Sequence, residues 1–131
     1  MGKQVPPNLR AFLLCREIAT DLQSKAYSLI KIFDGITGFA LPFAQEMCLY
    51  VAASGGHGTV PVDVIMTDPQ GTKLWSFMGK LEFKNPAGLG QLCIGFTTTF
   101  SMVGHHTFEL CFCGEPVAYH TLNVALAREE A

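Results

Sequence analysis

Residues 11–36 read AFLLCREIATDLQSKAYSLIKIFDGI, and this stretch decides the fold. Two apolar runs, residues 12–18 and 27–33, flank a polar connector at residues 20–25. Apolar residues at helical spacing allow a helix over the first run. The connector carries Thr, Asp and Ser, which bond to nearby backbone in turns, and the second run holds Tyr, Ile and Phe, which suit a strand. We therefore favour a β-hairpin, and both helix and strand stay open for residues 11–19.

As a strand, the second run would be apolar on both faces. One face would carry Leu29 and Phe33, and the other Ile30 and Ile32. A strand with two apolar faces is usually covered on both sides. The cover could be a loop of the same chain, and we expect residues 37–45 to pack over a sheet. It could also be a second copy of the chain, in which case Leu29, Ile30 and Ile32 form the interface of a homo-oligomer.

The remainder of the chain has the pattern of short strands separated by turns. We expect strands at residues 46–53, 60–67, 73–83, 92–100, 108–112 and 122–126. Asp68-Pro69-Gln70-Gly71 has the residues that a type I turn prefers at each position. Regularly spaced short strands with turns between them are typical of a sandwich. The sequence therefore predicts an all-β fold, an immunoglobulin-like antiparallel two-sheet β-sandwich of seven to eight strands.

The length of 131 residues fits one domain. We expect a flexible N-terminal arm at residues 1–8, a single β-sandwich domain at residues 9–126 and a C-terminal tail at residues 127–131. Hydrophobic residues make up 49% of the chain and charged residues only 15%, against a usual charged share of about 25%. A small domain with so few charges has a large core or hides part of its surface in an oligomer.

Charge and cysteine usage exclude several classes of function. The net charge is −2 and no basic block occurs, so binding to nucleic acid is not expected. No apolar run approaches the ~20 residues of a membrane span, and the start does not resemble a signal peptide. The five cysteines are odd in number and include no Cys-x-x-Cys, which is typical of packed thiols in a reducing compartment. We therefore expect a cytoplasmic protein.

The candidate metal ligands are His57, His105 and His106, because a neutral imidazole is a common ligand. Adjacent histidines on a strand point to opposite faces, so the simpler interpretation is surface or loop histidines. Cys111 and Cys113 would share a strand face, with His120 across a hairpin, but no fourth ligand for zinc follows nearby. We therefore expect no bound metal and no cofactor.

The sequence contains no catalytic signature. There is no Gly-x-Ser-x-Gly, and Gly55-Gly56-His57-Gly58 lacks the Lys-Ser/Thr of a phosphate-binding loop. Trp75 and Phe77 could form an exposed aromatic platform for a sugar or peptide, but their alternation suits a core equally well. We expect no enzymatic activity.

Several motifs give the chain a family resemblance: LLCRE at residues 13–17, SKAYSLIKIFDGI at 24–36, HTFEL at 106–110, and Gly114-Glu115. It resembles an uncharacterised family of small bacterial single-domain proteins, a domain of unknown function. The chain departs from the pattern at Ser24 and at Lys31, where the family tends to have Gly. The resemblance implies an immunoglobulin-like sandwich and carries no known activity or site residues.

From the residues we expect a non-enzymatic binding or assembly module that acts through protein–protein contacts. It would be a homo-oligomer with an unidentified protein partner, and with no nucleic-acid or membrane partner. The alternative is a small-ligand or metal-binding β-sandwich, possibly catalytic, built on His57, His105 and His106.

Overall fold

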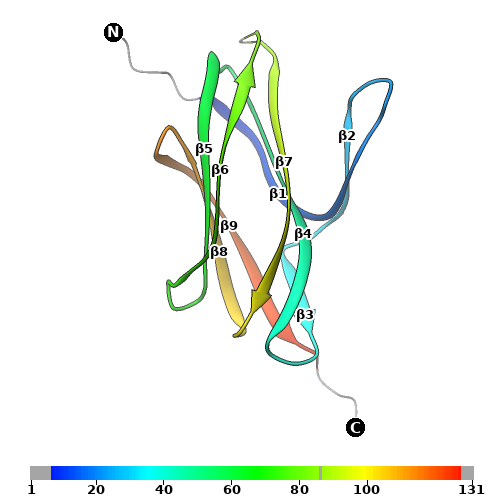
Figure 1. The fold of residues 1–131 in the computed structure, drawn as a ribbon, viewed down its shortest axis with the longest axis vertical. Helices are drawn as coiled ribbons and strands as arrows, with labels where there is room; N and C mark the ends of the chain where they lie inside the picture. The colour runs from blue at the N-terminus through cyan, green and yellow to red at the C-terminus, as the bar shows by residue number, and fades with distance from the viewer. Residues whose placement is uncertain (1–6, 86, 128–131) are drawn as a thin grey trace.

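A computed structural model describes residues 7–85 and 87–127, which form strands and connecting loops (Figure 1). Nine strands occur in this part of the chain. In chain order they are β1 (Asn8–Thr20), β2 (Tyr27–Ile32), β3 (Gly35–Gly38), β4 (Phe43–Ser54), β5 (Gly58–Thr67), β6 (Lys73–Phe83), β7 (Leu89–Phe100), β8 (Gly104–Phe112) and β9 (Glu115–Leu126). Nothing in the described ranges forms a helix that is long and apolar enough to span a membrane.

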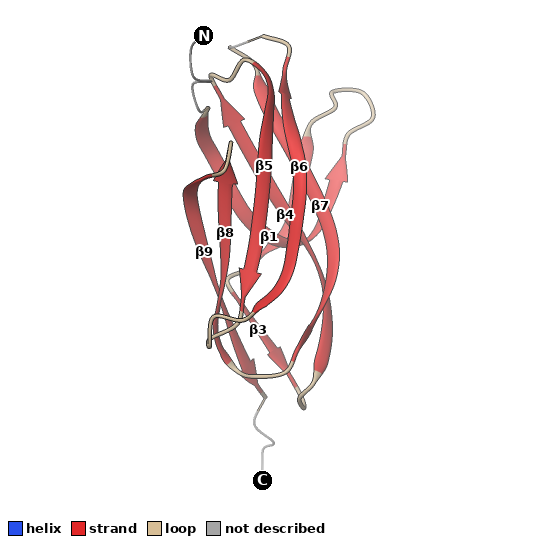
Figure 2. Ribbon diagram, turned by 60° about the vertical axis from the view of Figure 1, so that its left-hand side comes forward, coloured by secondary structure: helices blue, strands red, loops and turns tan. Residues whose placement is uncertain are grey.

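The strands form two sheets that pack face to face (Figures 1 and 2). Sheet A has the order β2-β1-β4-β7, and sheet B has the order β3-β9-β8-β5-β6. The run β9-β8-β5-β6 and the pair β4-β7 follow the strand arrangement of immunoglobulin domains. The predicted all-β, immunoglobulin-like sandwich is therefore confirmed.

Two details of the predicted architecture need correction. The strand that the sequence did not predict is β3, which raises the number from eight to nine. β3 pairs parallel with the end of β9, from Gly35 opposite Asn123 to Gly38 opposite Leu126, so the sandwich is not wholly antiparallel. The sequence pattern of a strand is weak at β3, because β3 has only four residues and two of them are glycine. β1 begins at Asn8, the last residue of the predicted arm, while residues 1–6 and 128–131 lie outside the described chain.

The predicted hairpin is confirmed, and residues 11–19 are strand. β1 and β2 pair antiparallel from Cys15 opposite Ile32 to Thr20 opposite Tyr27. In the connector, the Asp21 side chain accepts a hydrogen bond of 2.9 Å from the backbone N–H of Gln23. This bond lowers the pKa of Asp21, as expected for a carboxylate that accepts backbone donors. The hairpin therefore depends on the Asx-type turn that the sequence indicated.

The core lies between the two sheets. Its fully buried large side chains include Leu14, Met47, Leu49, Val51, Met66, Leu81, Phe100, Phe108, Leu110, Phe112 and Leu122. The ring of Trp75 stacks on Phe96 with centroids 4.3 Å apart and meets Phe108 edge-on at 6.3 Å. Trp75 and Phe77 pack against this core, so the core interpretation of these two aromatic residues is confirmed.

Part of the outer face of sheet A, on β4, is covered by the hairpin itself. Tyr50 and Ala52 are buried although they alternate with the core residues of β4. The ring of Tyr27 on β2 lies 6.2 Å from that of Tyr50, edge to face. β1 curves away from the rest of sheet A and pairs with β2 beyond the bend (Figure 1). One face of the hairpin thus packs over the outward side of β4.

The expectation that residues 37–45 pack over a sheet is wrong for the middle of that segment. Its ends belong to β3 and β4, where Phe43 packs against the core. The Phe43 ring leaves no space for a side chain at Gly38, where a Cβ would come within 2.3 Å of it. Residues 39–42 only turn the chain between the two strands, and Phe39 is 93% exposed. Ile30 and Ile32 are therefore left exposed by the described chain.

We expect Phe108→Ala to lower the free energy of unfolding by about 3–5 kcal/mol, because it opens a cavity among packed rings. Phe39→Ala is the matched control and should change the free energy of unfolding by less than about 0.5 kcal/mol. Urea denaturation followed by Trp75 fluorescence measures both. Equal losses for the two variants would contradict the assignment of core and surface.

Candidate protein-interaction site

The hairpin arm, defined here as residues 15–32, projects from sheet A (Figure 1). Its inward side carries Ile18 and Leu29, which are paired across the two strands and half-buried. Its outward side carries Ile30 and Ile32, which are 39% and 56% exposed. Of the three predicted interface residues, Ile30 and Ile32 are thus available for a partner, while Leu29 is turned toward the sandwich.

β2 is also the edge strand of sheet A. A strand edge presents N–H and C=O groups that can pair with another chain. Lys31 interrupts the extended backbone of this edge strand. Its φ of +57° lies in the left-handed region, which favours glycine. The same conformation gives a physical reason for the glycine that the resembling family tends to have here. A charged residue at this point of an edge is one way in which proteins limit unspecific pairing.

Charged side chains of both signs surround the exposed isoleucines. Arg16 and Lys31 are exposed on the two strands, and Glu17 lies directly opposite Ile30. With Asp21 and Lys25 in the connector, the arm carries three cations and two anions. The arm as a whole therefore has an excess of one positive charge. On its two faces the charges differ: Glu17 shares the face of Ile30, whereas Arg16 lines the groove with Glu46 and Cys48.

Three cysteines gather where the arm leaves sheet A, which the sequence did not indicate. Cys15 lies opposite Cys48, and Cys93 lies opposite Tyr50 on the next strand. Burial raises the pKa of the Cys15 thiol, and the neighbouring Cys48 adds to this effect. Burial also raises the pKa of Cys93, against a hydrogen bond with Tyr27 that lowers it. The described cysteines form no disulfide, and raised pKa values make Cys15 and Cys93 poor nucleophiles.

The candidate metal ligands do not come together. His57 lies in the loop before β5, whereas His105 and His106 lie at the start of β8, at the other end of the sandwich. His105 is exposed, but His106 is buried against Phe100, and its Nδ1 donates to the Gly104 carbonyl over 3.2 Å. Within residues 7–85 and 87–127, no three His, Cys, Asp or Glu side chains are placed to hold a metal ion.

The expectation that Cys111 and Cys113 share a strand face is wrong. Cys111 keeps the alternation of β8 and lies opposite Asp63, where it is almost fully buried. Cys113 lies beyond the end of β8, exposed and with a φ of +52°. The two thiols do not share a strand face because β8 ends at Phe112, before Cys113.

Shallow grooves in the described surface include one on each side of β1. One, of about 390 Å³, lies between β1 and β9 and is lined by Leu9, Arg10, Ala11, Phe12, Leu13, Ala118 and Tyr119. The other, of about 320 Å³, lies beside the arm and includes Arg16, Glu46 and Cys48. Neither lining contains a histidine, and in the second groove Cys48 lies two residues from Glu46 on β4.

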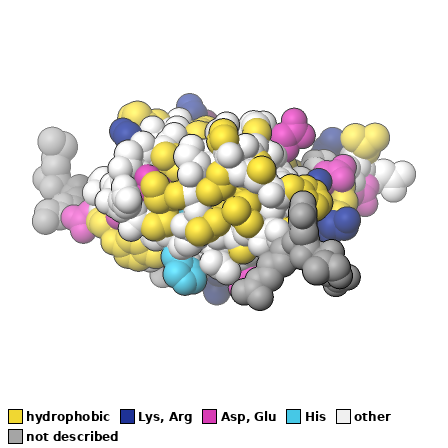
Figure 3. Space-filling model, turned by 90° about the horizontal axis from the view of Figure 1, so that it is seen from below, with side chains coloured by type: hydrophobic (Ala, Val, Ile, Leu, Met, Phe, Trp, Pro, Cys, Tyr) yellow, Lys and Arg dark blue, Asp and Glu magenta, His cyan; other side chains and the backbone are white. Residues whose placement is uncertain are grey.

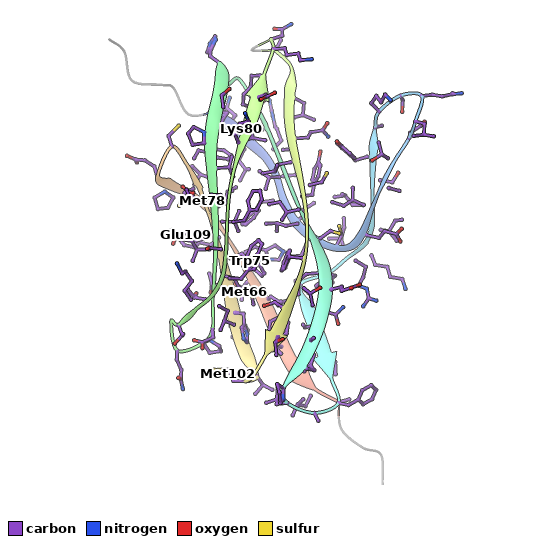
Figure 4. The ribbon with its side chains drawn as sticks, in the orientation of Figure 1. Met66, Trp75, Met78, Lys80, Met102 and Glu109 are labelled. Carbon is purple, nitrogen blue, oxygen red and sulfur yellow. The ribbon has the colours of Figure 1, made fainter. Side chains whose placement is uncertain are left out.

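A second surface that the sequence did not indicate lies on the outer face of sheet B. We call it the sheet B band, and it consists of Asp63, Ile65, Met78, Glu109 and Tyr119. Asp63 lies opposite Met78, and Glu109 lies opposite both Ile65 and Tyr119. Met78 is 83% exposed and Tyr119 is 63% exposed. Figure 4 shows Met78 and Glu109 on the side of β5 and β8, away from the arm.

The carboxylate of Glu109 organises the chemistry of this band. Burial raises the pKa of Cys111 to about 11, and a hydrogen bond from its thiol to Glu109 over 3.3 Å acts in the same direction. The negative charge of Glu109 also raises the pKa of Tyr119. Glu109 therefore raises the pKa of two neighbouring donors, the Cys111 thiol and the Tyr119 phenol.

Apolar side chains also gather at one end of the sandwich (Figure 3). Those exposed in the loops and strand ends there are Phe39, Leu41, Val103 and Leu126. Their backbones come together because Leu126 pairs with Gly38 and the β7–β8 loop follows Phe100, the partner of Phe43. This end patch has no charged side chain among its members, so it offers little basis for selecting a partner.

Comparison with solved structures finds a fold likeness. An immunoglobulin-like protein from Pseudomonas aeruginosa aligns over 94% of this chain and 99% of its own, with a TM-score of 0.40 and 11% sequence identity. The similarity is low, and the fold assignment therefore depends on the two sheets described above. No protein-family model matches the chain, and no curated protein sequence matches it.

We expect Glu109→Gln to lower the pKa of Tyr119 toward its ordinary value near 10, because the substitution removes the negative charge beside the phenol. Ultraviolet titration of tyrosinate between pH 8 and about 12 measures this. Tyr119→Phe is the reference that identifies the Tyr119 component of the curve. An unchanged titration curve in Glu109→Gln would contradict the electrostatic role of Glu109.

Proposed function

We propose that the protein is a non-enzymatic assembly module that binds a second copy of itself through the hairpin arm. The observation that carries this proposal is the exposure of Ile30 and Ile32 on an edge strand whose other face already packs on the sandwich. Apolar residues on a projecting strand edge are a typical means of strand-mediated association. The module would bind through its surface and without a cofactor.

We further propose membership of the uncharacterised family of small bacterial proteins, and action in the cytoplasm. The supporting features are the motifs at residues 13–17 and 24–36 and the left-handed backbone of Lys31, where that family tends to have glycine. Five cysteines without a disulfide agree with a reducing compartment.

The energetics of the arm indicate how large the contact must be. Full burial of an isoleucine side chain contributes about 1.5–3 kcal/mol. Two half-exposed isoleucines therefore supply only part of the free energy of a micromolar complex, which is about 8 kcal/mol. A stable interface usually buries about 1,200–2,000 Å² in total. The arm must therefore meet a broad surface of its partner rather than a single side chain.

We expect the mass of the wild-type protein in solution to rise with concentration above the 14.2 kDa of one chain. Ile32→Asp should weaken this association about 100-fold or more, because it removes apolar contact and places a charge in the interface. Multi-angle light scattering across a concentration series measures the effect.

Phe39→Asp is the matched control, because Phe39 is a more exposed apolar residue at the far end of the molecule. Circular dichroism verifies that both variants are folded. A wild-type protein that stays at 14.2 kDa up to about 1 mM, a concentration that would reveal even weak complexes, would refute self-assembly. Equal effects of the two substitutions would refute the role of the arm.

A further inference from the structure

We infer that the free edge of β7 pairs with the β7 edge of a second copy, antiparallel and around a two-fold axis, so that sheet A continues across both copies. This contact goes beyond the proposed function, because it does not use the hairpin arm. It would join residues 94–100 of the two copies, with Thr97 opposite the second copy's Thr97. A contact of this symmetry closes after two chains.

β7 lacks the features that normally prevent a strand edge from pairing. Its 12 residues include no charged side chain and no proline, and its register with β4 is unbroken from end to end. Proteins protect exposed edges with charges, proline, a bulge or a very short strand. A long, flat and uncharged edge therefore remains able to accept another strand.

The other three edge strands of the described chain, β2, β3 and β6, each have such a feature. β3 has only four residues, and β2 contains the left-handed backbone of Lys31. β6 carries Lys73, Lys80 and Glu82, and its register with β5 shifts near its start. The contrast with β7 is what selects the β7 edge as a pairing surface.

The hydrogen-bond pattern shows which backbone groups of β7 face the free edge. The Phe33 N–H donates to the Leu14 carbonyl over 3.1 Å, so the backbone groups of Leu14 point away from β4. Leu14, Leu49 and Ile94 form one row across β1, β4 and β7, and backbone groups alternate in direction along antiparallel strands. Ile94 therefore directs its groups toward β4, and Thr97 directs its N–H and C=O groups to the free edge.

The hairpin arm determines which part of the β7 edge is open. Tyr27 of the arm forms a hydrogen bond with Cys93, so the arm reaches the first half of β7. The stretch beyond it consists of residues 94–100, and Thr97 is its middle residue. A two-fold axis at Thr97 uses this whole stretch and sets the free backbone groups of the two strands opposite each other.

The charges beside this stretch permit the pairing of two identical edges. Glu46 on β4 lies opposite Thr97 and therefore on the same face. In the pair, the two copies of Glu46 would be three strand spacings apart, about 14 Å, which exceeds the Debye length of about 8 Å at physiological salt. Threonine opposite threonine is a favourable cross-strand pair. The contact therefore brings no like charges together.

Aromatic rings beside the edge supply apolar contact. Phe96 of β7 and both Trp75 and Phe77 of β6 are only half-buried, on the edge strands of the two sheets (Figure 2). The Trp75 ring stacks on both of the others, with centroids 4.3 Å from Phe96 and 6.5 Å from Phe77. A strand added to β7 extends the inner face of sheet A past these rings. Its inward side chains would bury the exposed part of the rings, which favours association.

Substitutions at Thr97 test the contact in chains that lack the arm contact. The Ile32→Asp variant should still form a pair of chains, twice 14.2 kDa, and the loss expected for this variant then applies to growth beyond the pair. Adding Thr97→Pro should weaken the pair about tenfold or more, because it removes one edge N–H from each copy and leaves the pairing with β4 unchanged. Thr97→Val keeps the N–H and is the matched control. Light scattering measures the mass, and circular dichroism verifies the fold.

Opposite charges at the two-fold axis test the register. Thr97→Lys and Thr97→Glu, each combined with Ile32→Asp, should be monomeric on their own, because like charges would lie directly opposite each other. Their equimolar mixture should form pairs that contain one chain of each variant. Thr97 is exposed, so it tolerates either charge without unfolding.

The outcomes distinguish the β7 contact from the arm contact. If Ile32→Asp stays at 14.2 kDa up to about 1 mM while the wild type associates, the β7 contact is wrong and the arm contact stands. Equal association of the Thr97→Pro and Thr97→Val chains would also overturn the β7 contact. A loss in Thr97→Pro without recovery in the Lys and Glu mixture would mean that the edge binds another strand, and it would overturn the two-fold pairing. A monomeric wild-type protein would refute both contacts.

Discussion

The burial of β4 on both of its faces is the constraint on which the rest of the structure depends. Its inward side chains, among them Leu49 and Val51, build the core against sheet B. Its outward side carries Tyr50 and Ala52, which are also buried. A strand that is apolar on both faces needs cover on both, and sheet B can supply only one. The chain solves this by folding its first hairpin back over sheet A.

Folding the hairpin over β4 leaves an apolar surface exposed on the hairpin itself. The hairpin places Leu29 and Tyr27 toward β4, and the pleat of β2 then turns Ile30 and Ile32 outward. Only one face of a projecting arm can pack against its own sandwich. The other face is left to contact solvent or a partner. The sheet B band lies on the other side of the sandwich, where the exposed Met78 and Tyr119 flank Asp63 and Glu109.

The sequence predicted most of the fold because its signals were local. The alternation in residues 92–100, the Asp68-Pro69-Gln70-Gly71 turn and the Asp21 connector depend on side chains close in the chain. The turn closes as expected, with the Gly71 N–H donating to the Asp68 carbonyl over 2.9 Å. The strand β3 was missed because a four-residue strand with two glycines has almost no periodic signal. The separation of Cys111 from Cys113 was missed because alternation alone does not show that β8 ends at Phe112.

The interaction surfaces could be predicted only in part. Ile30 and Ile32 were found because a two-sided apolar strand is unusual, but the choice between them and Leu29 depended on the curvature of β1. The sheet B band combines residues from β5, β6, β8 and β9, and its members come together only through the strand order of sheet B. The candidate ligands His57, His105 and His106 do not come together in the fold. His57 lies at one end of the sandwich and the other two lie at the opposite end, where His106 is buried.

Hydrogen–deuterium exchange at two protein concentrations tests the central claim most directly. If the arm is the surface through which copies assemble, the backbone amides of Tyr27–Ile32 exchange more slowly in a concentrated sample than in a dilute one. The amides of β4 serve as the internal reference, because they are already paired on both sides with β1 and β7. Equal exchange of β2 at both concentrations, in a sample whose light scattering shows assembly, would contradict the account.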